Sequence, residues 1–248
     1  MSIQPIIEPS CTDCSKTPAI ANIIDGRLRD LGGFSVRRLL PAATQPSVGP
    51  FVFFDHAGPT TLAPGAGIDI RPHPHIGLCT VSYLFDGAIL HRDSLGAEQI
   101  IRPGDLALMS AGRGIVHSER TPPKLRGSSI PMHALQLWIA LPQAEEEREP
   151  SFHHQPADTL PMITQGDAQL RVLIGQVYGA QSPVPTFTPT FYVDAWLPAG
   201  SELPLPNNYQ ERAAYVISGT VRIGNEHAEP GRLLIFTPEM ALQLHAQR

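Results

Sequence analysis

Turn-forming residues divide this chain into short apolar runs. Its 248 residues include 26 prolines and 21 glycines, and proline is about twice its usual share of roughly 5%. Proline interrupts both the hydrogen bonding and the packing of a helix, so frequent prolines leave little room for long helices. The sequence therefore predicts an all-β chain, folded as a sandwich or barrel of many short strands.

The runs between these turns are rich in β-branched and aromatic residues, as strands are. Turn dipeptides such as Asp86-Gly87, Pro103-Gly104 and Pro230-Gly231 separate them. The predicted strands are Phe34–Leu40, Val81–Phe85, Ala88–His91, Leu106–Met109, Leu135–Leu141, Leu170–Val177, Phe191–Leu197, Ala214–Ile217, Thr220–Ile223 and Leu233–Phe236.

A weak internal repeat predicts two tandem domains. Val81–Ile89 has the sequence VSYLFDGAI, Ala213–Val221 has AAYVISGTV, and a Pro-Gly turn with an apolar strand follows each. Chance likeness between two hairpins is the alternative. We expect a metal-binding domain at 1–145 and a domain without a metal site at 146–248. The second copy is expected to be truncated, because it ends near the position that matches His117. The charged run around Glu145–Arg148 is the best helix candidate, or else a linker turn before Pro150.

Composition and charge limit the classes of partner. The formal net charge is -5, and no cluster of Lys and Arg favours direct binding of nucleic acid. No apolar run reaches the roughly 20 residues of a membrane span, and the start lacks the pattern of a secretory signal. With three cysteines and no such signal, a reducing cytoplasm is expected. Cys11 and Cys14 are expected to be two thiols in a mobile tail.

Two pairs of metal-binding residues stand at strand spacing. In His73-Pro74-His75, residues i and i+2 of a strand face the same side, with Cβ atoms about 7 Å apart. His117-Ser118-Glu119 repeats this spacing with an imidazole and a carboxylate. On neighbouring strands, the two pairs would supply three nitrogens and one oxygen to a single ion. The sequence therefore predicts a mononuclear metal site.

The predicted donor set leaves the identity of the metal open. Mixed imidazole and carboxylate ligands suit Fe(II), Mn(II), Ni(II), Zn(II) or Cu(II). Nearby, Arg113 is expected to pair with a carboxylate, or alternatively to contact an anionic substrate. The flanking glycines are expected to let the backbone approach the metal closely or to adopt positive φ. His91 ends a predicted strand, and we expect it to stabilise a turn or, alternatively, to be a polar group near the site.

The chain resembles the pirins, a family of two-domain cupins. The resemblance rests on RPHPHIGLCTVSYLFDGAILHRDSLG, IRPGDLALMSAGRGIVHSER and LQLWIALP, and it extends more weakly through RVLIGQVYG and SPV. It implies two jelly-roll barrels with one iron, Fe(II), in the first, held by His73, His75, His117 and Glu119. Many pirins have a glutamate where this chain has Cys79, so the carboxylate must come from Glu119. Cys79 is expected to be a buried packing thiol, or alternatively a soft neighbour of the metal. Pirins usually continue past the point where this chain ends, through a final strand and a C-terminal helix.

The resemblance implies two classes of function. Similar bacterial proteins are quercetin 2,3-dioxygenases, which cleave a flavonol with O₂, and Glu119 would then be a fourth ligand or the general base. Other pirins are metal-dependent regulators that bind protein partners in transcription or metabolism. A zinc or manganese isomerase is a third alternative. A monomer or weak dimer is expected in each case.

Overall fold

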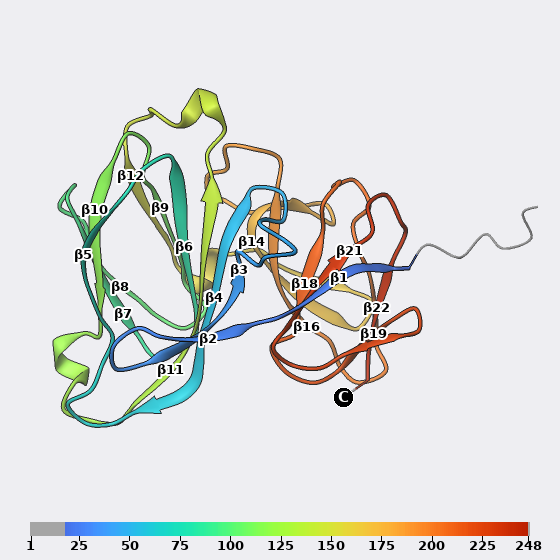
Figure 1. Ribbon diagram of the computed structural model, residues 1–248, viewed down its shortest axis with the longest axis horizontal. Coiled ribbons are helices and arrows are strands. Elements are labelled where there is room, and N and C mark those ends of the chain that lie inside the picture. The colour runs from blue at the N-terminus through green and yellow to red at the C-terminus, as the bar shows by residue number, and fades with distance from the viewer. Residues whose placement is uncertain (1–17, 248) are drawn as a thin grey trace, which may run out of the picture.

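A computed structural model describes residues 18–247, and nearly all of their regular structure is β-strand. Figure 1 shows two β-rich halves side by side, as predicted for an all-β chain of two tandem cupin barrels. The helices of the described residues are three short 3-10 turns: η1 (Pro123–Leu125), η2 (Gln143–Glu145) and η3 (Ala157–Thr159). The charged run after residue 145 is therefore a linker turn. Within residues 18–247, no helix has the length and apolar character needed to cross a membrane.

Two sheets form the first half. The larger has the order β12-β9-β6-β11-β4-β3-β2, and the smaller has the order β5-β10-β7-β8. An apolar cluster that includes Leu84, Ile89 and Met132 fills the space between them. The strands are β2 (Arg27–Asp30), β3 (Ser35–Leu40), β4 (Phe51–Leu62), β5 (Asp69–His75), β6 (Leu78–Asp86), β7 (Ile89–Asp93), β8 (Glu98–Ile101), β9 (Leu106–Ser110), β10 (Ile115–Arg120), β11 (Ile130–Ala140) and β12 (Ser151–Gln155).

The second half repeats this plan with shorter strands. Its sheet β17-β22-β19-β20 has the same order as β5-β10-β7-β8 in the first half, which supports the duplication inferred from the repeat. The remaining strands form the sheet β1-β21-β18 and a sheet in which β14 pairs with β13, β15 and β16. The strands are β1 (Ile20–Asp25), β13 (Met162–Gln165), β14 (Ala168–Val177), β15 (Ala180–Gln181), β16 (Phe191–Trp196), β17 (Glu202–Pro204), β18 (Ala213–Tyr215), β19 (Val221–Ile223), β20 (Glu226–Ala228), β21 (Arg232–Phe236) and β22 (Gln243–Ala246).

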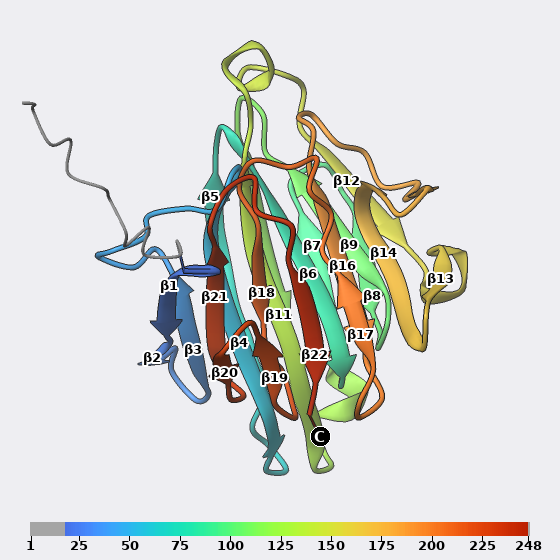
Figure 2. The same ribbon diagram turned by 90° about the vertical axis from the view of Figure 1, so that its right-hand side faces the viewer.

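Strand β6 is buried on both faces, because one face lines the interior of the first barrel and the other faces the second half, which lies in the foreground of Figure 2. Val81 and Tyr83 point into an apolar core that also contains Leu173 and Leu233 of the second half. Leu84, on the opposite face, belongs to the interior of the first barrel. This double burial explains why the strand appears in the sequence as an almost continuous apolar run rather than an alternating one.

Strand pairing crosses the predicted domain boundary twice. β1, near the start of the described residues, pairs with β21, and Ile20 lies opposite Phe236. In the other direction, β12 pairs with β9, and Ser151 lies opposite Ser110. Each half therefore completes a sheet with a strand from the other side of residue 145, while the boundary itself stays a prediction.

A buried histidine on β4 connects the two halves. His56 Nδ1 lies 2.7 Å from the hydroxyl of Tyr215 on β18, and His56 Nε2 lies 2.8 Å from Nε2 of His133. Burial, together with the neighbouring His133 and Arg37, lowers the pKa of His56 to about 4. His56 is therefore neutral in the folded protein near neutral pH.

We expect this contact to make the protein less stable in acid. The unfolded chain protonates His56 near pH 6.5 and the folded chain only near pH 4, so stability is lost as the pH falls through that window. At about pH 4.5 the loss due to this residue should be about 2–3 kcal/mol. Urea unfolding near pH 7 and pH 4.5 measures it, with His56→Asn, which does not titrate, as the comparison. An equal pH dependence in both proteins would contradict the prediction.

Candidate metal centre

Three imidazoles converge inside the first barrel. His73 and His75 lie on β5 and His117 lies on β10, directly opposite His73. One ligand nitrogen from each of these residues lies within 4.8 Å of the others. The Nε2 atoms of His73 and His117 are 3.1 Å apart. The alternate spacing on neighbouring strands has therefore brought the three side chains together as predicted, while their role as ligands stays a prediction.

The protonation of these rings suits a metal ion. His73 Nδ1 lies 2.9 Å from the carbonyl oxygen of Arg71, and a carbonyl only accepts, so Nδ1 donates this hydrogen bond. Burial lowers the pKa of His75 to about 4, and the neighbouring His73 adds to the shift. Burial likewise lowers the pKa of His117 to about 2, with contributions from the surrounding histidines. Neutral imidazoles at His75 and His117 fit a divalent transition metal.

Glu119 lines the same cavity but lies apart from the three nitrogens. An irregularity in the pairing of β10 with β5 follows His117, and Glu119 is opposite Ile70. Its carboxylate is buried and accepts a hydrogen bond of 3.0 Å from the hydroxyl of Ser82. Burial raises the pKa of Glu119, because a carboxylate without water is costly to charge. The carboxylate of Glu119 does not belong to the cluster in which the three histidine nitrogens lie within 4.8 Å of one another. Its hydrogen bond is instead to the hydroxyl of Ser82.

An aromatic wall flanks the histidines. The rings of Phe53 and Trp138 stack at 4.1 Å and 14°, and the ring of His75 meets Trp138 edge-on at 5.1 Å. The guanidinium of Arg38 lies 4.5 Å above the ring of Phe53 and forms a two-bond ion pair with Asp55. The cavity that these side chains line measures about 140 Å³. Its lining combines apolar and aromatic side chains with a few polar groups, as ligand cavities commonly do.

A row of polar side chains crosses the large sheet beside this wall. Asp55 on β4 is in register with Arg38 on one side and with Gln136 on the other. Gln136 is in turn opposite Ser82, and the two side chains are hydrogen-bonded at 2.8 Å. None of these residues was singled out in the sequence, because which residues face one another depends on strand register.

His91 lies against the candidate ligands. Its ring is buried, and its Nδ1 is 3.4 Å from Nδ1 of His117. This contact confirms the alternative of a polar group near the site. His91 also takes part in the turn, because its Nε2 lies 3.0 Å from Oδ2 of Asp93, whose Oδ1 accepts hydrogen bonds from the backbone N–H groups of Leu95 and Ala97. The signal was available, since His91-Arg92-Asp93 has the same alternate spacing as the other two pairs.

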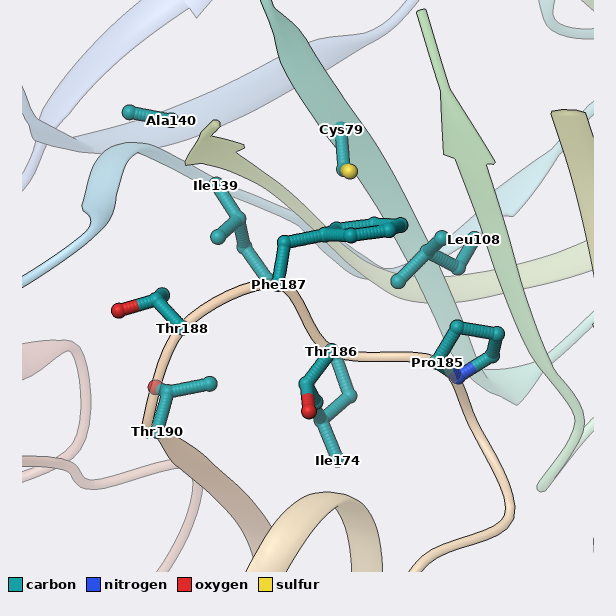
Figure 3. Close-up of a pocket in the computed structure, with 10 residues that line it drawn as sticks. All are labelled: Cys79, Leu108, Ile139, Ala140, Ile174, Pro185, Thr186, Phe187, Thr188 and Thr190. Carbon is teal, nitrogen blue, oxygen red and sulfur yellow. The ribbon is translucent and has the colours of Figure 1, made fainter. Parts of the chain in front are cut away.

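Cys79 faces away from the metal site. Figure 3 shows its sulfur in a small cavity between Leu108 of the first half and Phe187 of the second. Burial raises the pKa of the thiol to about 11, so it is neutral. Cys79 is therefore a packing residue, as expected, whereas Cys11 and Cys14 lie outside the described residues.

The loop before β10 also follows the expectations. Arg113 pairs with the carboxylate of Glu149 at 2.8 Å and not with a group in the cavity. Gly112 has a φ of 50°, and a Cβ there would lie 2.1 Å from the carbonyl oxygen of Arg148. Only glycine fits this close approach of the two backbones.

Known proteins with similar sequences identify the family. The family profile described as Pirin matches residues 33–139. A pirin-like protein of Caulobacter vibrioides is 43% identical over 219 residues, which are 87% of this chain and 76% of that protein. The chain belongs to the pirin family. Rat pirin is 35% identical to this pirin-family chain over 86% of it, and the match covers 72% of the rat protein.

A solved structure agrees with the fold of this pirin-family chain. A quercetin 2,3-dioxygenase from Acinetobacter baumannii superposes with a TM-score of 0.83 and 32% identity. The match covers 92% of this chain and 75% of the other. It therefore includes both halves of the fold.

Proposed function

We propose that this pirin-family chain holds one Fe(II) ion between His73, His75 and His117 and cleaves a flavonol with O₂. The convergence of three imidazoles on a cavity with an aromatic wall carries the proposal. The relative from Acinetobacter baumannii, a quercetin 2,3-dioxygenase, supports this choice of substrate class. Manganese, nickel, zinc and copper suit the same nitrogens and stay open.

The residues of the chain have distinct tasks in this proposal. A bound iron supplies Lewis acidity toward a substrate hydroxyl and a site for redox chemistry with O₂. The stacked rings of Phe53 and Trp138 orient a flat substrate along the wall. Glu119, held on Ser82, accepts the proton of the substrate hydroxyl as a general base. Burial of the carboxylate suits that task, since it raises the proton affinity of Glu119.

The test is a measurement of metal content and of flavonol loss in the same preparation. Protein purified in a reducing buffer and loaded with Fe(II) should contain about one iron per chain and should bleach quercetin absorbance in air. Under nitrogen the absorbance should persist, because O₂ is a substrate. Flavonol turnover under nitrogen would instead indicate an isomerase, which needs no O₂. Full metal occupancy with no loss of any flavonol in air would contradict the dioxygenase and favour a cytoplasmic regulator that binds a protein partner.

A further inference from the structure

An ion pair faces the interior of the first barrel. Arg38 on β3 follows Val36 at alternate spacing, and Val36 belongs to the apolar core of this barrel. Nε and Nη2 of Arg38 donate to the two carboxylate oxygens of Asp55, at 2.9 Å and 2.8 Å. The Asp55 side chain is only 6% exposed and the Arg38 side chain 31%. A buried ion pair adds little to stability, because desolvation of the charges offsets their attraction. A role in binding accounts for its place beside a cavity better than a role in folding.

This pair lies at the end of the cavity that is far from the candidate metal centre. Arg38 and Asp55 line the same cavity as the three histidines and Glu119. Ser82, which bonds Glu119, is separated from Arg38 by the register partners Gln136 and Asp55. Neighbouring strands are spaced by 4.7–4.9 Å, so the backbones of Ser82 and Arg38 lie about 14 Å apart. The two polar ends of the cavity therefore suit a ligand longer than a single aromatic ring.

The guanidinium of Arg38 is held in a fixed orientation. Asp55 binds two of its nitrogens, and its carbon lies 4.5 Å from the centre of the Phe53 ring. Phe53 stacks in turn on Trp138, whose ring meets His75 edge-on. A guanidinium that is already ordered loses little side-chain entropy when it binds a ligand, so its contacts add more to affinity.

The pair retains both donor and acceptor capacity. In the part of the chain that the structure describes, the Arg38 side chain donates only through Nε and Nη2, so the protons of Nη1 remain available. The carboxylate of Asp55 has lone pairs beyond the two that Arg38 uses. The two charges cancel, so the pair does not attract an anion. A hydroxyl matches this pair, because it accepts from Nη1 and donates to Asp55, whereas a carboxylate only accepts and is repelled by Asp55.

We propose that Arg38 and Asp55 bind a phenolic hydroxyl at the end of the substrate that lies away from the metal centre, so that the cavity selects hydroxylated flavonols. The choice of flavonols as ligands rests on the proposed function, but the hydrogen bonds to the outer hydroxyl do not depend on turnover. Arg38 and Asp55 are thus specificity residues, separate from the histidines and Glu119.

The test is titration calorimetry with protein loaded with Zn(II), which suits the same nitrogens and has no redox chemistry. The ligands are 3-hydroxyflavone and its derivatives with one more hydroxyl at the 4′ or the 7 position, the two outer ends of the molecule. At least one derivative should bind about 10-fold more tightly than 3-hydroxyflavone. Arg38→Met combined with Asp55→Leu removes the pair without leaving a buried charge, so this advantage should disappear. Arg92→Met combined with Glu98→Leu is the matched control, because this pair has the same two-bond geometry but is exposed and outside the cavity. The control should keep the advantage.

Asp55→Asn gives a second readout in which the preference changes sign. It leaves the charge of Arg38 uncompensated, so 3-hydroxyflavone with a carboxylate in place of the favourable hydroxyl should bind about 10-fold more tightly than to the unmutated protein. Equal affinities of the unmutated protein for 3-hydroxyflavone and both hydroxylated derivatives would overturn the proposal. So would a hydroxyl advantage that survives removal of the pair. Hydroxyl selection that follows the expected pattern in a protein whose iron form does not consume flavonols in air would refute only the dioxygenase and leave this inference standing.

Discussion

The His75→Ala variant is expected to lose metal binding and flavonol turnover together. His75 supplies one of three convergent nitrogens, and its removal leaves two imidazoles and a carboxylate that is bonded to Ser82. Loss of an outer-sphere partner costs about 10–100-fold in metal affinity, so loss of a direct ligand should cost more than about 100-fold. The fold should persist, because a shorter side chain facing a cavity creates no buried charge.

Trp138 provides a direct measurement of this effect. Its ring touches His75 edge-on, so a bound paramagnetic Ni(II) should quench its fluorescence. The titration is made in a Trp196→Phe background, because Trp196 is 66% exposed and would add an unrelated signal. His227→Ala, which removes an exposed histidine of the second half, is the control and should titrate like the unmutated protein. Equal quenching in His75→Ala and the control would place the metal elsewhere.

The Glu119→Gln variant is expected to keep its metal and lose its activity. Glutamine preserves the size of the side chain and an oxygen that can accept from Ser82, but it cannot take a proton from a substrate. General-base catalysis contributes typically about 10²–10⁴-fold, and turnover should fall by that factor. Metal content and flavonol turnover are measured on the same protein. Glu98→Gln, at an exposed ion pair on β8, should retain full turnover.

The metal content of Glu119→Gln distinguishes the two roles considered for this carboxylate. The structure has Glu119 on Ser82, apart from the three nitrogens, which favours a base that is not a permanent ligand. If iron is lost from Glu119→Gln as completely as from His75→Ala, Glu119 is a fourth ligand. The hydrogen bond to Ser82 would then have to be replaced by the metal.

The sequence was sufficient to predict the three histidines because a strand repeats every two residues. His73 and His75 had to share a face, and so did His117 and Glu119. What the sequence could not give is the register between strands. His73 and His117 are 44 residues apart, and a slip of one residue would have turned one of them to the other face. For the same reason, the sequence could not predict the polar row of the large sheet. Its members lie side by side only because their strands pair in this register: Arg38, Asp55, Gln136 and Ser82.

Local sequence patterns also could not predict that the two halves exchange strands. β1 precedes the first predicted strand, and nothing in IANIID indicates that its partner is β21. The prediction placed β1 with the first domain and β12 with the second, following their order along the chain. Long-range pairing decided both, since β1 pairs with β21 and β12 pairs with β9. Ile20 and Ile24 of β1 also join apolar clusters that contain residues from the second half.

The pairing of β1 with β21 has a consequence for how a cell makes this protein. Ile20 leaves the ribosome early, but Phe236, its partner, is added roughly 200 residues later, which is roughly 10–40 s at typical bacterial and eukaryotic translation speeds. Until then Ile20 lacks the residues of the second half, such as Leu234 and Phe236, whose apolar cluster it joins. Chaperones should therefore bind the nascent chain at β1. They should be released when β21, the partner of β1, has been synthesised.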